Sequence, residues 1–330
     1  RGGVPVNYHM LSDFRVARRA ALDDLLTQIV GCMLAAEAIT LERVAQDGMR
    51  VRASAGAASF RREETLERCL TEAREQVERL AQEREHPDPS VTNRQQAARE
   101  RGAREREERV AEALSYVPEV QAAKERQQRT LATGKREKVS APRVSTTDPQ
   151  ARVMKMPDGG FRPAYNVELA TVEGTGKAHG IIVGVAVTTE GTDAGQAVPM
   201  EEQVQERTGS HPQDYLVDGG FASREAITTL EQRGITVYAP VRLPRNKPEE
   251  ERYLPRQGDS PEVAAWRGRM ATPEAKAIYK ARGALAEWAN AQVRHLGVSQ
   301  FTVRGVAKVT AVMLLIAVTH NLLRWLAWGT

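Results

Sequence analysis

The segment from Arg61 to Lys138 constrains the fold more than any other part of the sequence. It carries 18 basic and 17 acidic residues in 78 positions, so about 45% of it is charged, against 27% for the whole chain. Tyr116 is its only aromatic residue. A segment this polar buries too little apolar surface to form a core by itself. The core therefore has to form from the other 252 of the 330 residues, which are enough for one large domain or two ordinary ones.

Helical periodicity organises this charged segment. Apolar residues recur in steps of four and three, which is the spacing of a coiled-coil seam: Leu66, Leu70, Ala73, Val77 and Leu80. Two prolines in residues 86–90 end that helix, and a second helix is predicted over residues 93–129. The pattern predicts an antiparallel helical hairpin. Its arginines have two interpretations, as contacts to DNA phosphates or as one half of a solvated face with alternating charge.

Composition excludes several classes of protein. The two cysteines, Cys32 and Cys69, form neither a disulfide framework nor a zinc site. The net charge of +4 is too small to identify a nucleic-acid partner. No signal peptide opens the chain, and the apolar run over residues 311–318 is too short and too soon interrupted to span a bilayer. We therefore expect a soluble cytoplasmic protein with no membrane contact, and the first residue, Arg1, favours a fragment that lacks its own N-terminus.

The rest of the chain alternates between strand and helix patterns. Helices are predicted over residues 8–38, 198–207, 223–233, 273–296 and 306–328. Strands are predicted over residues 162–172, 180–188, 214–217 and 235–241, with a short one at 299–304 and a loop at 242–262. Residues 39–56 are also strand-like, although Asp47-Gly48 in their middle is equally typical of a hairpin turn. This order predicts an α/β domain with a mixed sheet.

Asp218 is the strongest single candidate for chemistry. It directly follows a short buried strand, and ligands of open α/β sheets bind at the carboxyl ends of the strands. Gly219 and Gly220 allow a sharp turn that leaves the carboxylate accessible, although an aspartate that only caps the turn has the same pattern. A second Asp-Gly-Gly-Phe string begins at Asp158, after a polar linker, and we interpret that copy as a turn.

Glu287 is the candidate on a helix. Apolar neighbours place its helix against the body of the protein, with Asn290 one turn later and Arg294 on the same face. A carboxylate on a packed helix needs a partner or a metal, although a surface ion pair with arginine is the alternative. Together with Asp47 and Asp218 it supplies hard oxygen ligands that suit two Mg²⁺ or Mn²⁺ ions. The spacing of three acids does not by itself identify such a site.

Several strings in the sequence resemble one family. They are Val44-Ala-Gln-Asp-Gly-Met-Arg-Val-Arg-Ala, Asp158-Gly-Gly-Phe-Arg-Pro-Ala-Tyr-Asn-Val, Leu216-Val-Asp-Gly-Gly-Phe, and Ile278-Tyr-Lys-Ala-Arg with Glu287 and Asn290 after it. In this order they resemble bacterial insertion-sequence transposases of the DDE type, in the group with a Tyr-Arg-Glu-Lys signature. The resemblance implies an α/β fold, namely an RNase H-like mixed sheet with flanking helices, interrupted by the charged helical hairpin as an insertion.

The resemblance also implies roles for individual residues. Asp47, Asp218 and Glu287 would be the catalytic acids that hold two Mg²⁺ (or Mn²⁺) ions. DNA contacts would come from four further positions: Tyr279, Arg282, Asn290 and Arg294. Arg294 stands where the signature has lysine, which keeps the charge and changes the geometry. Arg282 precedes Glu287 by five residues, one more than is usual in the signature.

The resemblance finally predicts the domain organisation and the activity. Residues 1–38 would be the remnant of an N-terminal helical domain, 39–56 the first strand region of the catalytic domain, 57–140 the helical insertion, and 141–330 the rest of the catalytic domain. The expected activity is metal-dependent strand cleavage and strand transfer at insertion-sequence ends, with element and target DNA as partners and a homodimer on DNA. The alternatives are another RNase H-like nuclease and a non-catalytic remnant that binds DNA or a protein partner.

Overall fold

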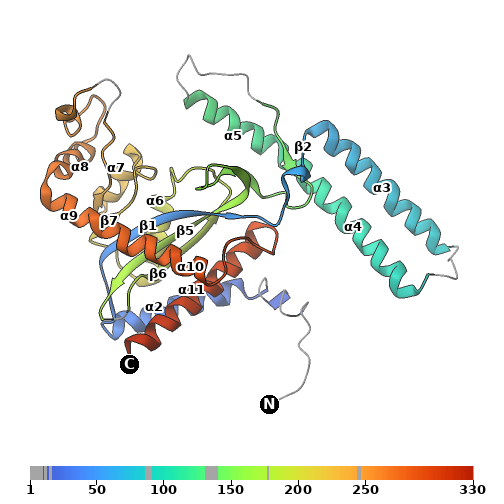
Figure 1. Ribbon diagram of the computed structural model, residues 1–330, viewed down its shortest axis with the longest axis horizontal. Coiled ribbons are helices and arrows are strands. Elements are labelled where there is room, and N and C mark those ends of the chain that lie inside the picture. Colours follow the sequence, from blue (N-terminus) through green and yellow to red (C-terminus); the bar gives the residue numbers. More distant parts are fainter. Residues whose placement is uncertain are drawn as a thin grey trace. The chain divides into compact units, whose positions relative to one another are not determined.

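The computed structural model describes residues 17–85, 91–130, 140–176, 178–243 and 247–329, together with residues 10, 13 and 14 (Figure 1). The chain divides into two compact units. Unit 1 consists of Arg1–Val51, Asn166–Gln300 and Val306–Thr330, and unit 2 of Arg52–Tyr165 and Phe301–Gly305. The predicted start of the first helix at residue 8 and the predicted break at residues 86–90 lie outside the described residues.

A mixed sheet forms the centre of unit 1. Its strands are β1 (Ile39–Arg52), β5 (Phe161–Gly174), β6 (Ile181–Thr188), β7 (Asp214–Leu216) and β8 (Thr236–Tyr238). They lie in the order β6-β5-β1-β7-β8, with β5 and β6 antiparallel and with β7 parallel to both β1 and β8. The predicted α/β class with a mixed sheet and flanking helices is therefore confirmed, and the arrangement is compatible with an RNase H-like fold.

Strand β1 runs without interruption through Asp47 and Gly48, so the hairpin turn that the Asp-Gly pair allowed is wrong. The reason is that β1 lies between β5 and β7, and central strands are buried on both faces. Glycine is needed at position 48 because the side chain of a neighbouring strand comes close to the β1 backbone there, and not because the chain turns. A Cβ atom at this position would lie 2.8 Å from Glu168 Oε1 on the neighbouring strand.

Helices flank the sheet. They are α2 (Arg19–Ala35), α6 (Ala197–Thr208), α7 (Arg224–Gln232), α8 (Pro261–Ala271), α9 (Pro273–Arg282), α10 (Trp288–His295) and α11 (Val306–Trp328). Figure 1 shows α2 and α11 side by side, and both pack on β6. Helix α8 begins inside the predicted loop 242–262, where Ser260 caps it by accepting a hydrogen bond from the Val263 N–H. The short strand predicted at residues 299–304 is reduced to a single bridge residue, Gln300, followed by the Phe301 N–H, which donates to the Arg52 carbonyl at 2.8 Å.

Helix α11 is long and apolar enough to pass a length-and-composition test for a membrane span, which the prediction from its short apolar run did not anticipate. Its two central polar side chains bond the sheet. His320 Nε2 lies 2.9 Å from the Gly180 carbonyl oxygen, and Asn321 bonds both the N–H and the carbonyl of Ile182. A core helix packed on a sheet passes the same test, so this observation is weak evidence for a membrane.

Unit 2 contains α3 (Glu63–Glu85), α4 (Asn93–Ser115) and α5 (Val117–Thr130). It also contains the short strands β2 (Phe60–Arg61) and β3 (Val144–Ser145), and β4 (Arg152–Lys155), which pairs with residues 161–164, the start of β5 that belongs to unit 2. Helices α3 and α4 pack together, and Leu66, Ala73 and Leu80 of the predicted seam are buried. The single helix predicted over residues 93–129 is two helices that meet at Tyr116, because Pro118 has no N–H for the ladder.

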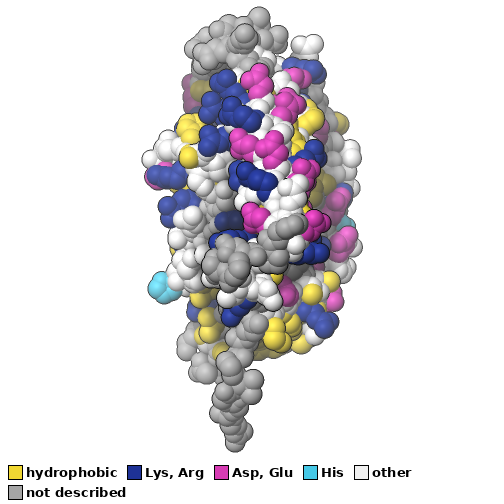
Figure 2. All heavy atoms as spheres, turned by 90° about the vertical axis from the view of Figure 1, so that its right-hand side faces the viewer, with side chains coloured by type: hydrophobic (Ala, Val, Ile, Leu, Met, Phe, Trp, Pro, Cys, Tyr) yellow, Lys and Arg dark blue, Asp and Glu magenta, His cyan; other side chains and the backbone are white. Residues whose placement is uncertain are grey.

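The polar face of α3 and α4 carries both signs of charge. Figure 2 shows Lys and Arg side chains interleaved with Asp and Glu side chains. Two of the arginines pair across the two helices, Arg74 with Glu107 at 3.4 Å and Arg106 with Glu72 at 3.8 Å. Such pairing is typical of a solvated face, and exposed pairs of this kind contribute about 0–1 kcal/mol each.

Candidate active site

The register between β1 and β7 places two of the predicted acids side by side. Ala45 lies opposite Leu216 in the parallel ladder. Continuing that register by two residues puts Asp47 opposite Asp218, just beyond the end of β7. The two carboxylates are close enough for Asp218 to help raise the pKa of Asp47. The sequence-predicted pair thus meets at the carboxyl end of a parallel strand, where α/β sheets bind ligands.

Asp218 also stabilises its own turn. Its Oδ1 accepts a hydrogen bond of 2.5 Å from the Gly220 N–H. A Cβ atom on Gly220 would lie 2.8 Å from that same oxygen and 3.1 Å from Asp193 Oδ2, so a side chain there would displace one of the two carboxylates. The capping and the functional interpretation of Asp218 are therefore not exclusive, since one oxygen caps while the other stays available.

Asp47 has two polar partners on the helices that follow α8, one at the end of α9 and one in α10. Asn290 Nδ2 donates to Asp47 Oδ2 at 3.0 Å, and Arg282 Nη1 lies 3.5 Å from Asp47 Oδ1. Burial raises the pKa of Asp47, the Arg282 guanidinium opposes this, and the nearby carboxylates of Asp218 and Asp193 raise it further. The site therefore favours an additional positive charge next to Asp47.

A π-helical turn from Gly283 to Glu287, called the π-turn below, joins α9 and α10 into one rod (Figure 1). In an α-helix, residues five apart point about 140° away from each other. In a π-helix the backbone hydrogen bonds join residues five apart, so both lie on one face. Arg282 Nη2 accordingly lies 3.9 Å from Glu287 Oε1. The π-turn therefore places two residues that are five apart in the sequence on one face of the helix.

The remaining predicted residues differ in their surroundings. The Arg282 guanidinium lies 5.9 Å from the centre of the Tyr279 ring, which orders both side chains on α9. Burial raises the pKa of the Tyr279 hydroxyl, so this group stays neutral near pH 7. Asn290 is only 6% exposed, whereas Arg294 is exposed in the last turn of α10. The structure thus gathers six of the seven predicted side chains, and leaves Arg294 on the surface.

The fit of these residues to a divalent metal is mixed. Asp47 and Asp218 present hard carboxylate oxygens, and Asn290 Oδ1 is a buried oxygen that accepts no hydrogen bond from any described residue. Within the described ranges, no three His, Cys, Asp or Glu side chains lie together closely enough to hold one ion. The Arg282 guanidinium lies between Asp47 and Glu287, 3.5 Å from Asp47 Oδ1 and 3.9 Å from Glu287 Oε1. The donor chemistry suits Mg²⁺ or Mn²⁺, with Glu287, whose side chain is 68% exposed, free to move.

Sequence reasoning missed a second polar group behind β1. Alternate residues of a strand point to opposite faces, so Gln46 and Gly48 face away from Asp47. Glu168 accepts hydrogen bonds there from Gln46 Nε2 at 3.1 Å and from Asn166 Nδ2 at 2.7 Å, and Asn166 also donates to Asp193. Burial, and then the negative charge of Asp193, raise the pKa of Glu168 to about 8. The signal available in the sequence was the polar pair at 166 and 168 within an otherwise apolar strand.

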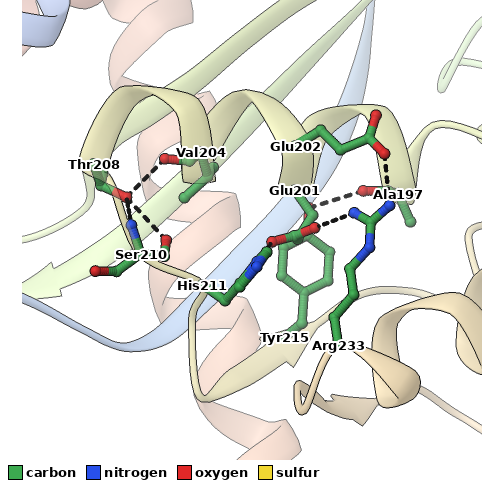
Figure 3. A network of polar contacts seen from close by, with 9 residues as sticks. All are labelled: Ala197, Glu201, Glu202, Val204, Thr208, Ser210, His211, Tyr215 and Arg233. Atoms are coloured by element: carbon green, nitrogen blue, oxygen red, sulfur yellow. Dashed lines mark hydrogen bonds and ion pairs between the residues drawn. The ribbon is translucent and has the colours of Figure 1, made fainter.

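Figure 3 shows a third polar network, which involves residues of α6 and β7. Glu201 on α6 is fully buried and accepts hydrogen bonds from Arg233 Nη1 and His211 Nδ1, both at 2.6 Å. The buried Tyr215 hydroxyl donates to Gln46 Oε1 at 2.7 Å. Tyr215 thereby joins β7 to β1, the strand that carries Asp47, while Glu201 joins α6 to Arg233 at the end of α7 and to His211 before β7.

One comparison with known proteins covers the C-terminal part of the chain. Residues 246–326 match the family model described as a transposase DDE domain, over about a quarter of the chain. The matched segment contains the π-turn with Arg282, Glu287 and Asn290, and it ends within α11. The match confirms the resemblance to DDE transposases that the sequence strings predicted. No curated protein and no solved structure matches the chain.

Proposed function

We propose that the protein is a DDE transposase that cleaves DNA at the ends of an insertion sequence and joins the released 3′ ends to target DNA, in the cytoplasm of a bacterial cell. The observation that carries the proposal is the meeting of Asp47 and Asp218 on adjacent parallel strands, next to a helical rod that brings Glu287 to the same side. Residues 39–56 and 141–330 would form the RNase H-like catalytic domain around the helical segment 57–140.

The three acids have distinct tasks in this proposal. Asp47 and Asp218 would hold Mg²⁺ or Mn²⁺, and Glu287 would complete the site once DNA displaces Arg282 from between the carboxylates. Two bound ions would supply activation of the attacking water or 3′-hydroxyl and stabilisation of the leaving oxygen. The protein's own part is positioning, because in-line phosphoryl transfer requires aligned groups more than covalent chemistry.

The basic and polar residues of the rod serve the same site. Arg282 and the exposed Arg294 would contact DNA phosphates, for which the guanidinium fork is well suited. Tyr279 orders Arg282 and adds an aromatic surface beside the DNA. Asn290, buried with its amide on Asp47, would hold that carboxylate in place and support the DNA site indirectly. Reaction at two element ends favours a homodimer on DNA.

The chain offers a matched control for a test of this proposal. Asp218 and Asp158 both begin the string Asp-Gly-Gly-Phe, but Asp158 lies in an exposed turn of unit 2. DNA carrying the element ends is incubated with Mg²⁺ and each variant. We expect Asp218→Asn and Glu287→Gln to abolish both nicking and strand-transfer products and Asp158→Asn to leave them unchanged. Equal activity of all three variants would refute the assignment of the acids.

Two alternatives remain distinguishable in the same experiment. Cleavage without strand-transfer products would indicate an RNase H-like nuclease of another kind. The position of Arg282 between Asp47 and Glu287 favours the other alternative, a non-catalytic protein that binds DNA with this cation in place of a metal. That alternative predicts DNA binding without Mg²⁺-dependent cleavage by the wild-type protein.

A further inference from the structure

Four arginines, called the arginine cluster below, bond backbone carbonyls beyond the carboxyl end of β7, and one of them, Arg242, lies next to Asp218. They are Arg224 at the start of α7 and Arg242, Arg252 and Arg256 between β8 and α8. Arg242 donates from Nη2 to the carbonyl oxygen of Gly219 at 2.9 Å, directly after Asp218. The cluster thus begins at the residue next to the proposed metal ligand.

Backbone carbonyls hold most of this cluster. Arg256 Nη2 donates to the carbonyl oxygens of Arg242 at 2.8 Å and of Arg252 at 3.1 Å. Arg252 Nη1 donates to the carbonyl of Val241 at 3.1 Å, and Arg224 Nη1 to that of Gly258 at 3.4 Å. A carbonyl oxygen fixes a guanidinium in position without cancelling its charge. The arrangement therefore orders positive charge and leaves much of it uncompensated.

Two of the four arginines, Arg224 and Arg252, form ion pairs with carboxylates. Asp259, whose side chain is 1% exposed, pairs with Arg224 at 3.2 Å and more tightly with the buried Arg267 at 2.6 Å. Arg252 pairs with the exposed Glu249 at 2.6 Å. Burial and the neighbouring charge of Arg267 lower the pKa of Arg256, as expected where cations crowd. The printed side-chain hydrogen bonds of Arg242 and Arg256 go to backbone carbonyls, so their charge is the part of the cluster that is ordered without an ion pair.

We infer that the arginine cluster binds the backbone phosphates of the DNA strand that enters the site over Asp218. This inference rests on the proposed function for the identity of the anion. Ordered guanidinium forks bind phosphate oxygens in two-pronged geometry, and contacts to successive phosphates position a strand without reading its sequence. The cluster lies on α7 and the β8–α8 segment, whereas Arg282 and Arg294 lie on the rod. The two sets would contact the strand from different elements of unit 1.

Salt dependence of DNA binding tests the inference without requiring catalysis. The full chain is titrated against a short labelled DNA duplex of arbitrary sequence, with a chelator in place of metal, at several salt concentrations. Each lost phosphate contact lowers the slope of log K against log salt by about one. We expect this decrease for Arg242→Gln and for Arg224→Gln, and a wild-type slope for Arg242→Lys, which keeps the charge.

Arg43→Gln is the charge-matched control, since Arg43 pairs with Asp214 at the opposite end of β7. We expect it to keep the wild-type slope. Equal slopes for Arg242→Gln, Arg224→Gln and Arg43→Gln would overturn the inference, and thermal melting of each variant shows whether the fold is intact. If the arginine variants lower the salt slope but the wild-type protein never cleaves DNA, this inference stands and the proposed function is refuted. The failure of one can therefore be told from the failure of the other.

Discussion

Glu168→Gln is expected to remove a pH-dependent loss of stability. Glu168 is fully buried, and both of its oxygens accept hydrogen bonds from amide groups on β1 and β5. Burial, together with the negative charge of Asp193, raises its pKa from 4.5 to about 8. The folded protein therefore holds this proton at neutral pH, whereas the unfolded chain has released it.

The sign and size of the effect follow from linkage. Below about pH 4.5 both states carry the proton, and the contribution of Glu168 to stability is at its maximum. Between about pH 4.5 and pH 8 only the unfolded state loses the proton, so stability falls by about 1.4 kcal/mol per pH unit. From about pH 5 to pH 8 the loss is about 4 kcal/mol. For a unit of this size that corresponds to roughly 10 °C in melting temperature.

The assay compares melting temperatures of wild type and Glu168→Gln across this range, with a chelator present. The amide places a donor opposite a neighbouring amide, which costs stability equally at every pH. The informative quantity is therefore the difference between the two proteins as a function of pH, in which the other titrating groups largely cancel. We expect wild type to fall relative to Glu168→Gln as the pH rises. Parallel curves would refute the raised pKa and the assigned role of burial.

Three further changes test other parts of the structure. Deletion of Ala284 should convert the π-turn into an α-helical turn with Glu287 still facing Arg282, so DNA cleavage should persist, whereas a deletion within α10 should abolish it. Gly48→Ala should melt at a lower temperature and lose cleavage, because its Cβ would lie 2.8 Å from a Glu168 oxygen. Leu66→Ala removes a fully buried side chain from the core of unit 2 and should cost about 2–5 kcal/mol in denaturant unfolding of that unit.

Strand patterns in the sequence predicted most of the sheet because burial dominates them. The apolar run 180–188 and the short run before Asp218 could hardly be anything but buried strands, and they became β6 and β7. Asp47-Gly48 misled because a turn and a close approach both require glycine, and only the neighbouring strand decides between them. Helix α8 was missed because its capping signal, Ser260-Pro261, follows a stretch rich in proline and charge.

The candidate site was partly predictable for the same reason. Asp218 stood out because it follows a buried strand, and parallel pairing then brings Asp47 beside it. For the Glu168 group, the polar pair at 166 and 168 was a signal in the sequence, but the contact with Gln46, 122 positions away, was not predictable from it. The arginine cluster was hidden for a related reason. Arginine–carbonyl contacts depend on loop conformation, which no periodicity in the sequence records.

The π-turn shows how packing decides where an extra residue goes. After the π-turn, apolar side chains of α10 pack against the rest of unit 1, with Ala289 and Val293 fully buried. Before the π-turn, Ala275 of α9 is buried as well. Both segments are therefore fixed in rotation, and an additional residue between them has to be stored locally. A π-turn stores it at the cost of poorer hydrogen-bond geometry. In exchange Glu287 keeps its contact with Arg282 although the two residues lie five positions apart.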